Sequence, residues 1–168
     1  MNDTILEMTN ISKHFPGVLA LNGVNFTAKA SKVNVIVGEN GAGKTTLMKI
    51  LAGVIEKDSG SITVEGKIAQ IKHPLDAKRN RIAMIHQELN LVPYLNIAEN
   101  IHLGRMPARL GVVDKRQMVR SSNALLNDIG LSLDSRTVVS ALSTGQRQMI
   151  EIVKAISIGS RIIIMDEP

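Results

Sequence analysis

The chain has 168 residues, 44% hydrophobic and 21% charged, a balance typical of one globular domain rather than of a disordered chain. It contains no cysteine, which excludes disulfides and cysteine-bound zinc, and no apolar run approaches the roughly 18 to 20 residues of a membrane helix. The net charge of +5 would suit a nucleic-acid face, but the basic residues are scattered and the aromatic residues are one Tyr and two Phe, so we expect no nucleic-acid site.

The first third of the sequence alternates short apolar runs with polar breaks, the pattern of β-strands. The predicted strands cover residues 5–9, 24–28, 33–37 and 61–65. Between the last two, Leu47, Ile50 and Leu51 are spaced to share one face of a helix, which Gly53 would end. A strand, a glycine-rich turn and a helix in this order begin an α/β unit.

A further strand is predicted at residues 82–85, and after it the sequence pattern changes from strands to helices. Residues 91–140 are predicted to be mainly helical, with Asn96 and Asp114 as N-caps for Glu99 and Gln117 three residues on. Ser143 is expected to cap another helix, which Gly159 would end, and a last strand is predicted at residues 161–165. The predicted apolar stripe of that helix consists of Met149, Ile152, Val153 and Ile156.

The turn after residues 33–37 fits the phosphate-loop pattern G-x-x-x-x-G-K-[ST]. Its glycines allow successive backbone N–H groups and the following helix N-terminus to point at one anion. Lys44 would add a charge on the β- and γ-phosphates, and the Thr45 hydroxyl would bind magnesium. The expected nucleotide-contacting residues are Gly38, Glu39, Asn40, Gly41, Ala42, Gly43, Lys44, Thr45 and Thr46.

This loop predicts nucleotide binding without specifying the chemistry, because kinases, GTPases and motor ATPases share it. The alternative dinucleotide fingerprint is excluded, because Thr46 stands where its third glycine is required.

A second motif distinguishes among these classes. Leu142-Ser-Thr-Gly-Gln146 precedes a helix, and the terminal strand then runs into Asp166-Glu167. This resembles the signature and Walker B motifs of ABC-transporter ATPases, at their usual order and spacing, over essentially the whole chain. The stretches at residues 14–24 and 84–105 resemble, more narrowly, the ATP-binding subunits of monosaccharide importers of the ribose, galactose and methyl-galactoside type.

The resemblance implies a role for residues that the spacing alone leaves open. Phe15 matches the aromatic residue that stacks on adenine, and Ser143, Gly145 and Gln146 match the signature that contacts the ATP of a partner domain. Gln87 and Glu167 match the glutamine and glutamate that act on the hydrolytic water. Magnesium would be held by Thr45, Gln87 and Asp166.

The fold implied by the resemblance is α/β, a P-loop NTPase (RecA-like) core of the ABC ATPase type with an antiparallel β subdomain and a helical insertion. We expect residues 1–90 to hold the β subdomain and P-loop core, 91–140 the helical subdomain, and 141–168 the signature helix and Walker B strand. The implied partners are membrane permease subunits, a periplasmic or extracellular sugar-binding protein and a second ABC ATPase domain arranged head to tail. The implied location is the cytoplasmic face of the membrane, as a peripheral subunit.

The resemblance also implies that residues beyond Pro168 complete the fold, with a D-loop, a further parallel strand and a switch histidine. The missing strand would lie between residues 33–37 and the Walker B strand, so we expect the chain, truncated there, to be marginally stable and weak or inactive as an ATPase. The alternative is a non-catalytic remnant or interaction fragment that binds nucleotide or an importer subunit without turnover. An ABC ATPase acting on DNA or ribosomes would need long insertions that this sequence lacks.

Overall fold

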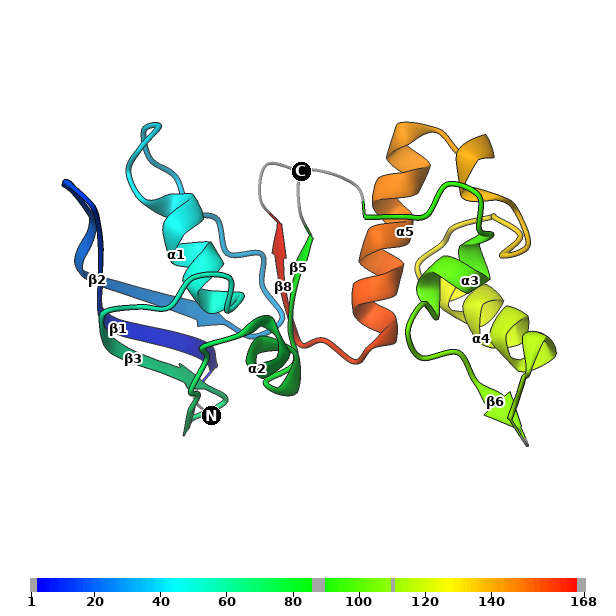
Figure 1. Cartoon of the computed structure of the whole chain (residues 1–168), viewed down its shortest axis with the longest axis horizontal. Helices are drawn as coiled ribbons and strands as arrows, with labels where there is room; N and C mark the ends of the chain where they lie inside the picture. Colours follow the sequence, from blue (N-terminus) through cyan, green and yellow to red (C-terminus); the bar gives the residue numbers. More distant parts are fainter. Residues whose placement is uncertain (1–2, 86–89, 110, 166–168) are drawn as a thin grey trace. The chain divides into compact units, whose positions relative to one another are not determined.

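The computed structural model describes residues 3–85, 90–109 and 111–165. The chain divides into two compact units, Met1–Ala83 and Met84–Pro168, and Figure 1 labels the helices and strands of each. The division expected at residues 90 and 140 stays a prediction.

The first unit is built on an antiparallel sheet of four strands in the order β2-β1-β3-β4. The strands are β1 (Thr4–Phe15), β2 (Val18–Lys29), β3 (Ser59–Val64) and β4 (Lys67–Ile68). On β1 the buried residues alternate through Leu6 and Met8 until Asn10, whose φ of 53° marks a bulge. The extra residue shifts the alternation by one, so that Ile11 is buried.

The strands predicted at residues 5–9 and 24–28 are confirmed but are longer than predicted, and the strand predicted at 61–65 is found at 59–64. β1 and β2 form a long hairpin that continues to Phe15 and Val18 at its turn. Polar residues in the outer half of this hairpin interrupt the apolar pattern that predicts a strand. Cross-strand hydrogen bonds rather than burial stabilise that half.

Two helices accompany this sheet, α1 (Lys44–Leu51) and α2 (Pro74–Arg79). Leu47, Ile50 and Leu51 are buried on one face of α1, as predicted, and Gly53 follows its end with a φ of 71°. The sequence did not predict α2, whose six residues are too few to show a helical period.

The strand predicted at residues 33–37 is wrong. The structure assigns no strand to this segment, and Val33, Val35 and Val37 are 93%, 74% and 88% exposed. Alternating valines supply β-propensity, but a strand also needs a neighbour to accept and donate its backbone hydrogen bonds, and the four-stranded sheet does not include this segment. The chain therefore reaches the phosphate loop through an exposed segment that is not a strand.

The second unit is mainly helical. Its helices are α3 (Ile97–Ile101), α4 (Lys115–Asp128), a short 3₁₀ helix η1 (Val139–Ala141) and α5 (Thr144–Ser157). They share one buried core of Ile97, Ile101, Leu126, Val139, Leu142, Ile150 and Val153. Its strands are the hairpin β6 (Ala108–Arg109) and β7 (Val112–Val113), and β8 (Ile162–Met165), which pairs with β5 (Ile82–Ile85).

The predicted helix caps of this unit are confirmed. Asn96 and Ser143 accept hydrogen bonds from the amides three residues on and complete capping boxes, and Asp114 accepts one from Gln117 N at 2.9 Å. Gly159, with a φ of 75°, follows the end of α5 as expected.

The predicted apolar stripe of α5 is wrong in part. The residues buried on this helix are Ile150, Glu151, Val153 and Ala155. Of the predicted stripe only Val153 is among them, and Ile156 is 38% exposed. α5 carries apolar residues on more than one side, so periodicity alone did not indicate which side packs into the core.

Candidate functional site

The phosphate loop follows the exposed segment 33–37 and ends at α1. Gly41 and Gly43 adopt φ angles of 84° and 85°, in the left-handed region that favours glycine. The first hydrogen bond of α1 runs from Leu47 N to Gly43 O at 2.9 Å. The amides that precede it belong to the helix N-terminus, where backbone N–H groups favour an anion.

The lysine of the motif lies over its own loop. Lys44 Nζ donates to the carbonyl oxygens of Gly38 at 2.6 Å and Glu39 at 2.8 Å. A turn from Ala42 N to Glu39 O at 3.2 Å closes the same segment. The ammonium group is therefore held at the loop, beside the glycine amides, where a phosphate would meet both.

The end of the loop is packed directly against β2. A Cβ atom added to Gly43 would lie 2.7 Å from Ala20 O and 2.7 Å from Leu21 Cδ2, closer than real Cβ contacts. No side chain larger than glycine fits there without displacing the loop from the hairpin. The position of the loop is thus set by the β1–β2 hairpin.

The same hairpin presents exposed apolar side chains near its turn. Phe15 is 39% exposed, and Val18 and Leu19 are 61% and 49% exposed. Phe15 pairs with Val18, and Leu19 immediately precedes the residue that Gly43 touches. The first unit therefore brings the predicted adenine-stacking residue and the phosphate loop onto one hairpin.

The signature residues lie at the N-terminus of α5. Gln146 N donates to Ser143 Oγ at 3.3 Å, and Ser143 N donates to Gln146 Oε1 at 2.9 Å. Ser143, Thr144 and Gly145 are exposed, whereas Leu142 just before them is buried in the helical core. The start of α5 is thus fixed by its own capping hydrogen bonds and by the buried Leu142, and its exposed residues are accessible to a ligand.

Three of the predicted catalytic and metal-binding residues, Gln87, Asp166 and Glu167, lie outside the described residues. Elsewhere on α5, Lys154 Nζ donates to Asn90 O at 3.2 Å. This bond joins α5 to the segment that leads into α3.

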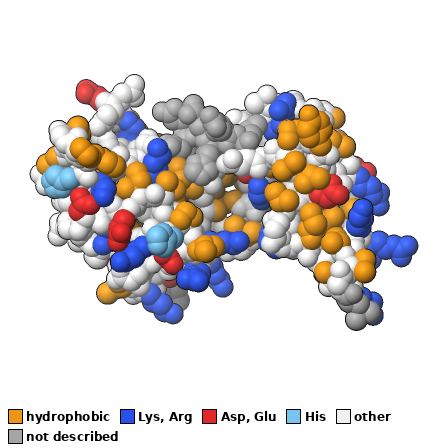
Figure 2. Space-filling view, viewed as in Figure 1, with side chains coloured by type: hydrophobic (Ala, Val, Ile, Leu, Met, Phe, Trp, Pro, Cys, Tyr) orange, Lys and Arg blue, Asp and Glu red, His pale blue; other side chains and the backbone are white. Residues whose placement is uncertain are grey.

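The second unit also contains an open cavity of about 630 Å³ beside α3 and α4. Its lining includes Lys115, Arg116, Arg120 and Arg136 against a single carboxylate, Glu99. Figure 2 shows Lys and Arg side chains interspersed with a hydrophobic area on the visible face of this unit. The cavity favours an acidic ligand or an acidic segment of a partner.

Two further findings concern the described residues as a whole. Among residues 3–85, 90–109 and 111–165, no three His, Cys, Asp or Glu side chains are grouped so as to hold a metal ion. None of the helices described is long and apolar enough to cross a membrane.

Comparison with known proteins identifies the family. The sequence profile that describes the ABC transporter family matches residues 21–168. The chain belongs to the ABC transporter family. Membership of this family implies nucleotide binding.

The similar ABC-family proteins include import proteins. A ribose import ATP-binding protein of Rubrobacter xylanophilus is 49% identical over 98% of this chain and 33% of its own length. A galactose/methyl galactoside import ATP-binding protein of Clostridium tetani is 48% identical over 99% of this chain and 34% of its own. The chain thus spans about a third of the length of the import proteins it matches.

Solved structures confirm the ABC ATPase fold. A nucleotide-free ATP-binding cassette from an ABC transporter superposes with a TM-score of 0.83 at 27% identity, over 98% of this chain and 69% of that chain. The ADP conformation of an ATP-binding cassette of an ABC transporter gives a TM-score of 0.83 at 28% identity, with the same coverages.

Sequence reasoning missed two polar networks in this ABC-family chain. Asp58 binds Lys13 and the His14 amide beside Phe15, and Asn100 is fully buried with four hydrogen bonds to the segment 92–96. A signal existed for Asn100, because an asparagine between Ala98 and Ile101 interrupts an apolar helix face. The sequence contains no such signal for Asp58, because an aspartate before Ser59-Gly60 is typical of an ordinary turn.

Proposed function

We propose that this chain is the ATP-binding part of an ABC ATPase that energises monosaccharide import. The observation that carries the proposal is the geometry of residues 38–45, where left-handed glycines, a helix N-terminus and the Lys44 ammonium group converge. These groups together suit a triphosphate, because backbone amides and the Lys44 ammonium group neutralise its charge. The identity to ribose and galactose import proteins supports the sugar class.

The nucleotide would be divided between the loop and the hairpin. The phosphates would contact the amides and side chains of residues 38–46, and adenine would stack on Phe15 near the turn of β1 and β2. The exposed fraction of Phe15 and the contact of Gly43 with the hairpin make this division sterically reasonable.

Magnesium fits the donor chemistry of the proposed site. Thr45 stands at the start of α1, and Gln87 and Asp166 would supply the remaining protein oxygens. When bound, the ion would neutralise charge on the β- and γ-phosphates. Glu167 and Gln87 would orient and polarise the hydrolytic water.

The signature would serve a second nucleotide. Ser143, Gly145 and Gln146 would contact the ATP held by another ABC ATPase domain in a head-to-tail arrangement. The exposed, internally capped start of α5 supports this role, because it offers backbone N–H groups to an anion without a rearrangement of the helix.

The proposed partners are membrane permease subunits and a sugar-binding protein, with the ATPase peripheral on the cytoplasmic face. Residues 91–140 would contact the permease and transmit nucleotide-driven closure to it. The basic cavity beside α4 supports this assignment by offering a charged surface that the proposed nucleotide site does not use.

One observation favours the alternative of nucleotide binding without turnover. The segment 33–37 that leads into the phosphate loop pairs with no strand among the residues that the structure describes, and it exposes three valines. A loop entered by an unpaired segment is less firmly held, and hydrolysis depends more strongly on exact placement than binding does.

Nucleotide binding and steady phosphate release, measured on the purified chain with Mg-ATP, separate the two functions. We expect Mg-ATP to raise the unfolding temperature and Lys44→Met to remove that shift, because the cation at the loop is lost. Steady phosphate release would favour the catalytic function for this chain, and binding without release the alternative. An unfolding temperature that Mg-ATP does not change would contradict both.

Coupling is tested in an importer that carries this sequence. Arg116→Glu and Arg120→Glu, both in the basic cavity, should abolish sugar uptake while ATP binding remains. Lys67→Glu, on the exposed edge strand β4, is the matched charge reversal outside the 91–140 region and should leave uptake unchanged. Normal uptake in the arginine variants would contradict the assignment of the permease contact.

A further inference from the structure

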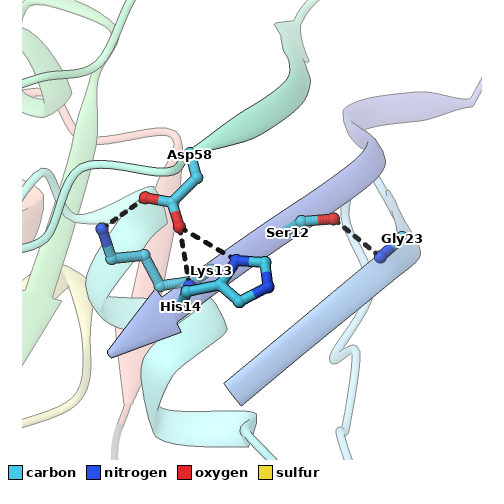
Figure 3. A network of polar contacts seen from close by, with 5 residues as sticks. All are labelled: Ser12, Lys13, His14, Gly23 and Asp58. Carbon is cyan, nitrogen blue, oxygen red and sulfur yellow. Dashed lines mark hydrogen bonds and ion pairs between the residues drawn. The ribbon is translucent and has the colours of Figure 1, made fainter. Parts of the chain in front are cut away.

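The end of β1 is fixed by one carboxylate, that of Asp58 just before β3. Asp58 Oδ1 accepts a hydrogen bond from Lys13 Nζ at 2.6 Å, and Oδ2 accepts one from the His14 amide at 2.6 Å. Figure 3 shows the Asp58 side chain directed at both residues, with the His14 ring nitrogen Nδ1 also facing Oδ2, at 3.4 Å. The Asp58 amide in turn donates to Ser12 O at 3.0 Å. Three consecutive residues of β1 are therefore tied to Asp58.

These contacts lie immediately before Phe15 and constrain its ring. Lys13 Nζ stands over the ring at 5.7 Å from its centroid, within the range of a cation–π interaction. The Lys13 side chain is only 17% exposed, whereas Phe15 is 39% exposed. With the Lys13 cation above one face, a planar ligand would have to stack on the opposite face of the ring.

The Phe15 ring and the phosphate loop both lie against the β1–β2 hairpin. The position of the ring therefore matters for a ligand that contacts both. Phe15 pairs with Val18 at the turn, and two residues further along β2 the backbone of Ala20 touches Gly43. A shift of the β1 end would therefore change the distance between an aromatic platform and the phosphate site, while the loop itself remained seated on Ala20 and Leu21.

We propose that Asp58 is a positioning residue for base recognition. Through Lys13 and the His14 amide it holds the Phe15 ring as a one-sided stacking platform for the purine of a nucleotide whose phosphates bind at residues 38–45. This inference rests on the proposed nucleotide-binding function and adds to it the residue that sets the platform.

The charge state of Asp58 agrees with this role. The hydrogen bond from Lys13, followed by that from the His14 amide, lowers the pKa of the Asp58 carboxyl below its ordinary value of 3.8. The carboxylate is therefore ionised throughout the neutral range. As an ion pair at a partly exposed site it contributes only modestly to stability, so its principal effect is to fix geometry.

The test compares a ligand that has a base with one that lacks it. We expect Asp58→Ala to weaken binding of a non-hydrolysable ATP analogue with Mg²⁺ by about 3- to 10-fold, the range that an aromatic contact of ordinary strength represents. Binding of inorganic tripolyphosphate with Mg²⁺ should stay unchanged, because its contacts are confined to the loop. Asp58→Asn, which keeps an acceptor for the His14 amide but loses the charge facing Lys13, should have an intermediate effect.

Asp76→Ala is the matched control, since its carboxylate also accepts from two backbone amides and pairs with a cation in the same unit, away from the hairpin. It should leave both affinities unchanged. In a Phe15→Ala background, Asp58→Ala should cause no further loss of ATP-analogue affinity, because the platform it positions is gone.

Three outcomes would overturn the inference. Equal loss of both ligands in Asp58→Ala would mean that Asp58 supports the unit as a whole, and no loss of either would mean that it positions nothing. An additional loss in the Phe15→Ala background would mean that it acts elsewhere. Wild-type chain that binds neither ligand would overturn the proposed function itself, which distinguishes that failure from failure of the positioning role alone.

Discussion

Replacement of the buried Asn100 of α3 by alanine is expected to destabilise the helical unit by about 2.5 to 4.5 kcal/mol. The Asn100 side chain is 0% exposed. Its Oδ1 accepts from Val92 N at 2.7 Å, and its Nδ2 lies 3.0, 3.3 and 3.1 Å from the carbonyl oxygens of Val92, Leu95 and Asn96. One amide thus holds the whole entry segment of α3.

The size of this loss in unfolding free energy depends on which backbone partners of Asn100 keep another hydrogen bond in Asn100→Ala. The three carbonyls keep one each, from Leu95 N, Val139 N and the backbone amide of residue 100. They therefore lose about 0.5 kcal/mol apiece, whereas the Val92 N–H loses its hydrogen bond to Asn100 Oδ1 at a cost of about 1 to 3 kcal/mol. Asn100→Asp should cost more at neutral pH, because a carboxylate would face three carbonyl oxygens.

Urea unfolding of the chain, followed by circular dichroism, measures these differences. Asn127→Ala, at an exposed position of α4, is the control and should change the free energy of unfolding by less than about 0.5 kcal/mol. Asn100→Asp should recover stability as the pH falls, because the carbonyls raise the pKa of the introduced carboxyl in the folded state above its unfolded value. An Asn100→Ala loss no larger than that of Asn127→Ala would refute the reasoning.

Three further predictions concern other positions. Gly43→Ala should lower the unfolding free energy more than Gly41→Ala, since both have φ near +85° but only Gly43 is packed against β2, and urea unfolding with ATP-analogue titration checks this. Glu151→Met should raise the unfolding free energy by about 1 kcal/mol, because Glu151 Oε1 is buried without a hydrogen-bond partner among the described residues; a decrease in the urea midpoint would contradict this. Because the folded-state pKa of Asp58 is lowered, its network contributes stability above the ordinary pKa of 3.8 and loses it as the pH falls through the folded-state value. The stability difference between wild type and Asp58→Asn should therefore be largest near neutral pH and shrink in acid, and a pH-independent difference would count against the network.

The fold could be predicted where local chemistry and tertiary packing agree. The buried face of α1 and the caps at Asn96, Asp114 and Ser143 follow from side-chain spacing that acts within one turn of helix, and each is confirmed. The segment 33–37 failed because a strand depends on a partner that its own residues do not specify.

The site could be predicted only as far as motifs encode it. The phosphate loop and signature were found because backbone geometry and anion binding restrict their residue types. The network of Asp58 with Lys13 could not be found, because it joins residues 45 positions apart whose types are common at any surface. Its existence depends on the register of β1 with β3, which pairs Ser12 with Ser59, and no local pattern encodes that register.

The exposed segment 33–37 has a consequence for how the chain behaves at high concentration. Val-Asn-Val-Ile-Val is short, uncharged and rich in β-branched residues, and lacks proline, the composition of segments that stack into cross-β zippers. Lys32 and Glu39 flank it as charged gatekeepers, so self-association should depend on salt as well as on protein concentration. Changing Val35 to Lys would place a charge in the middle of the segment and should keep the chain monomeric, at a position 74% exposed and outside the core.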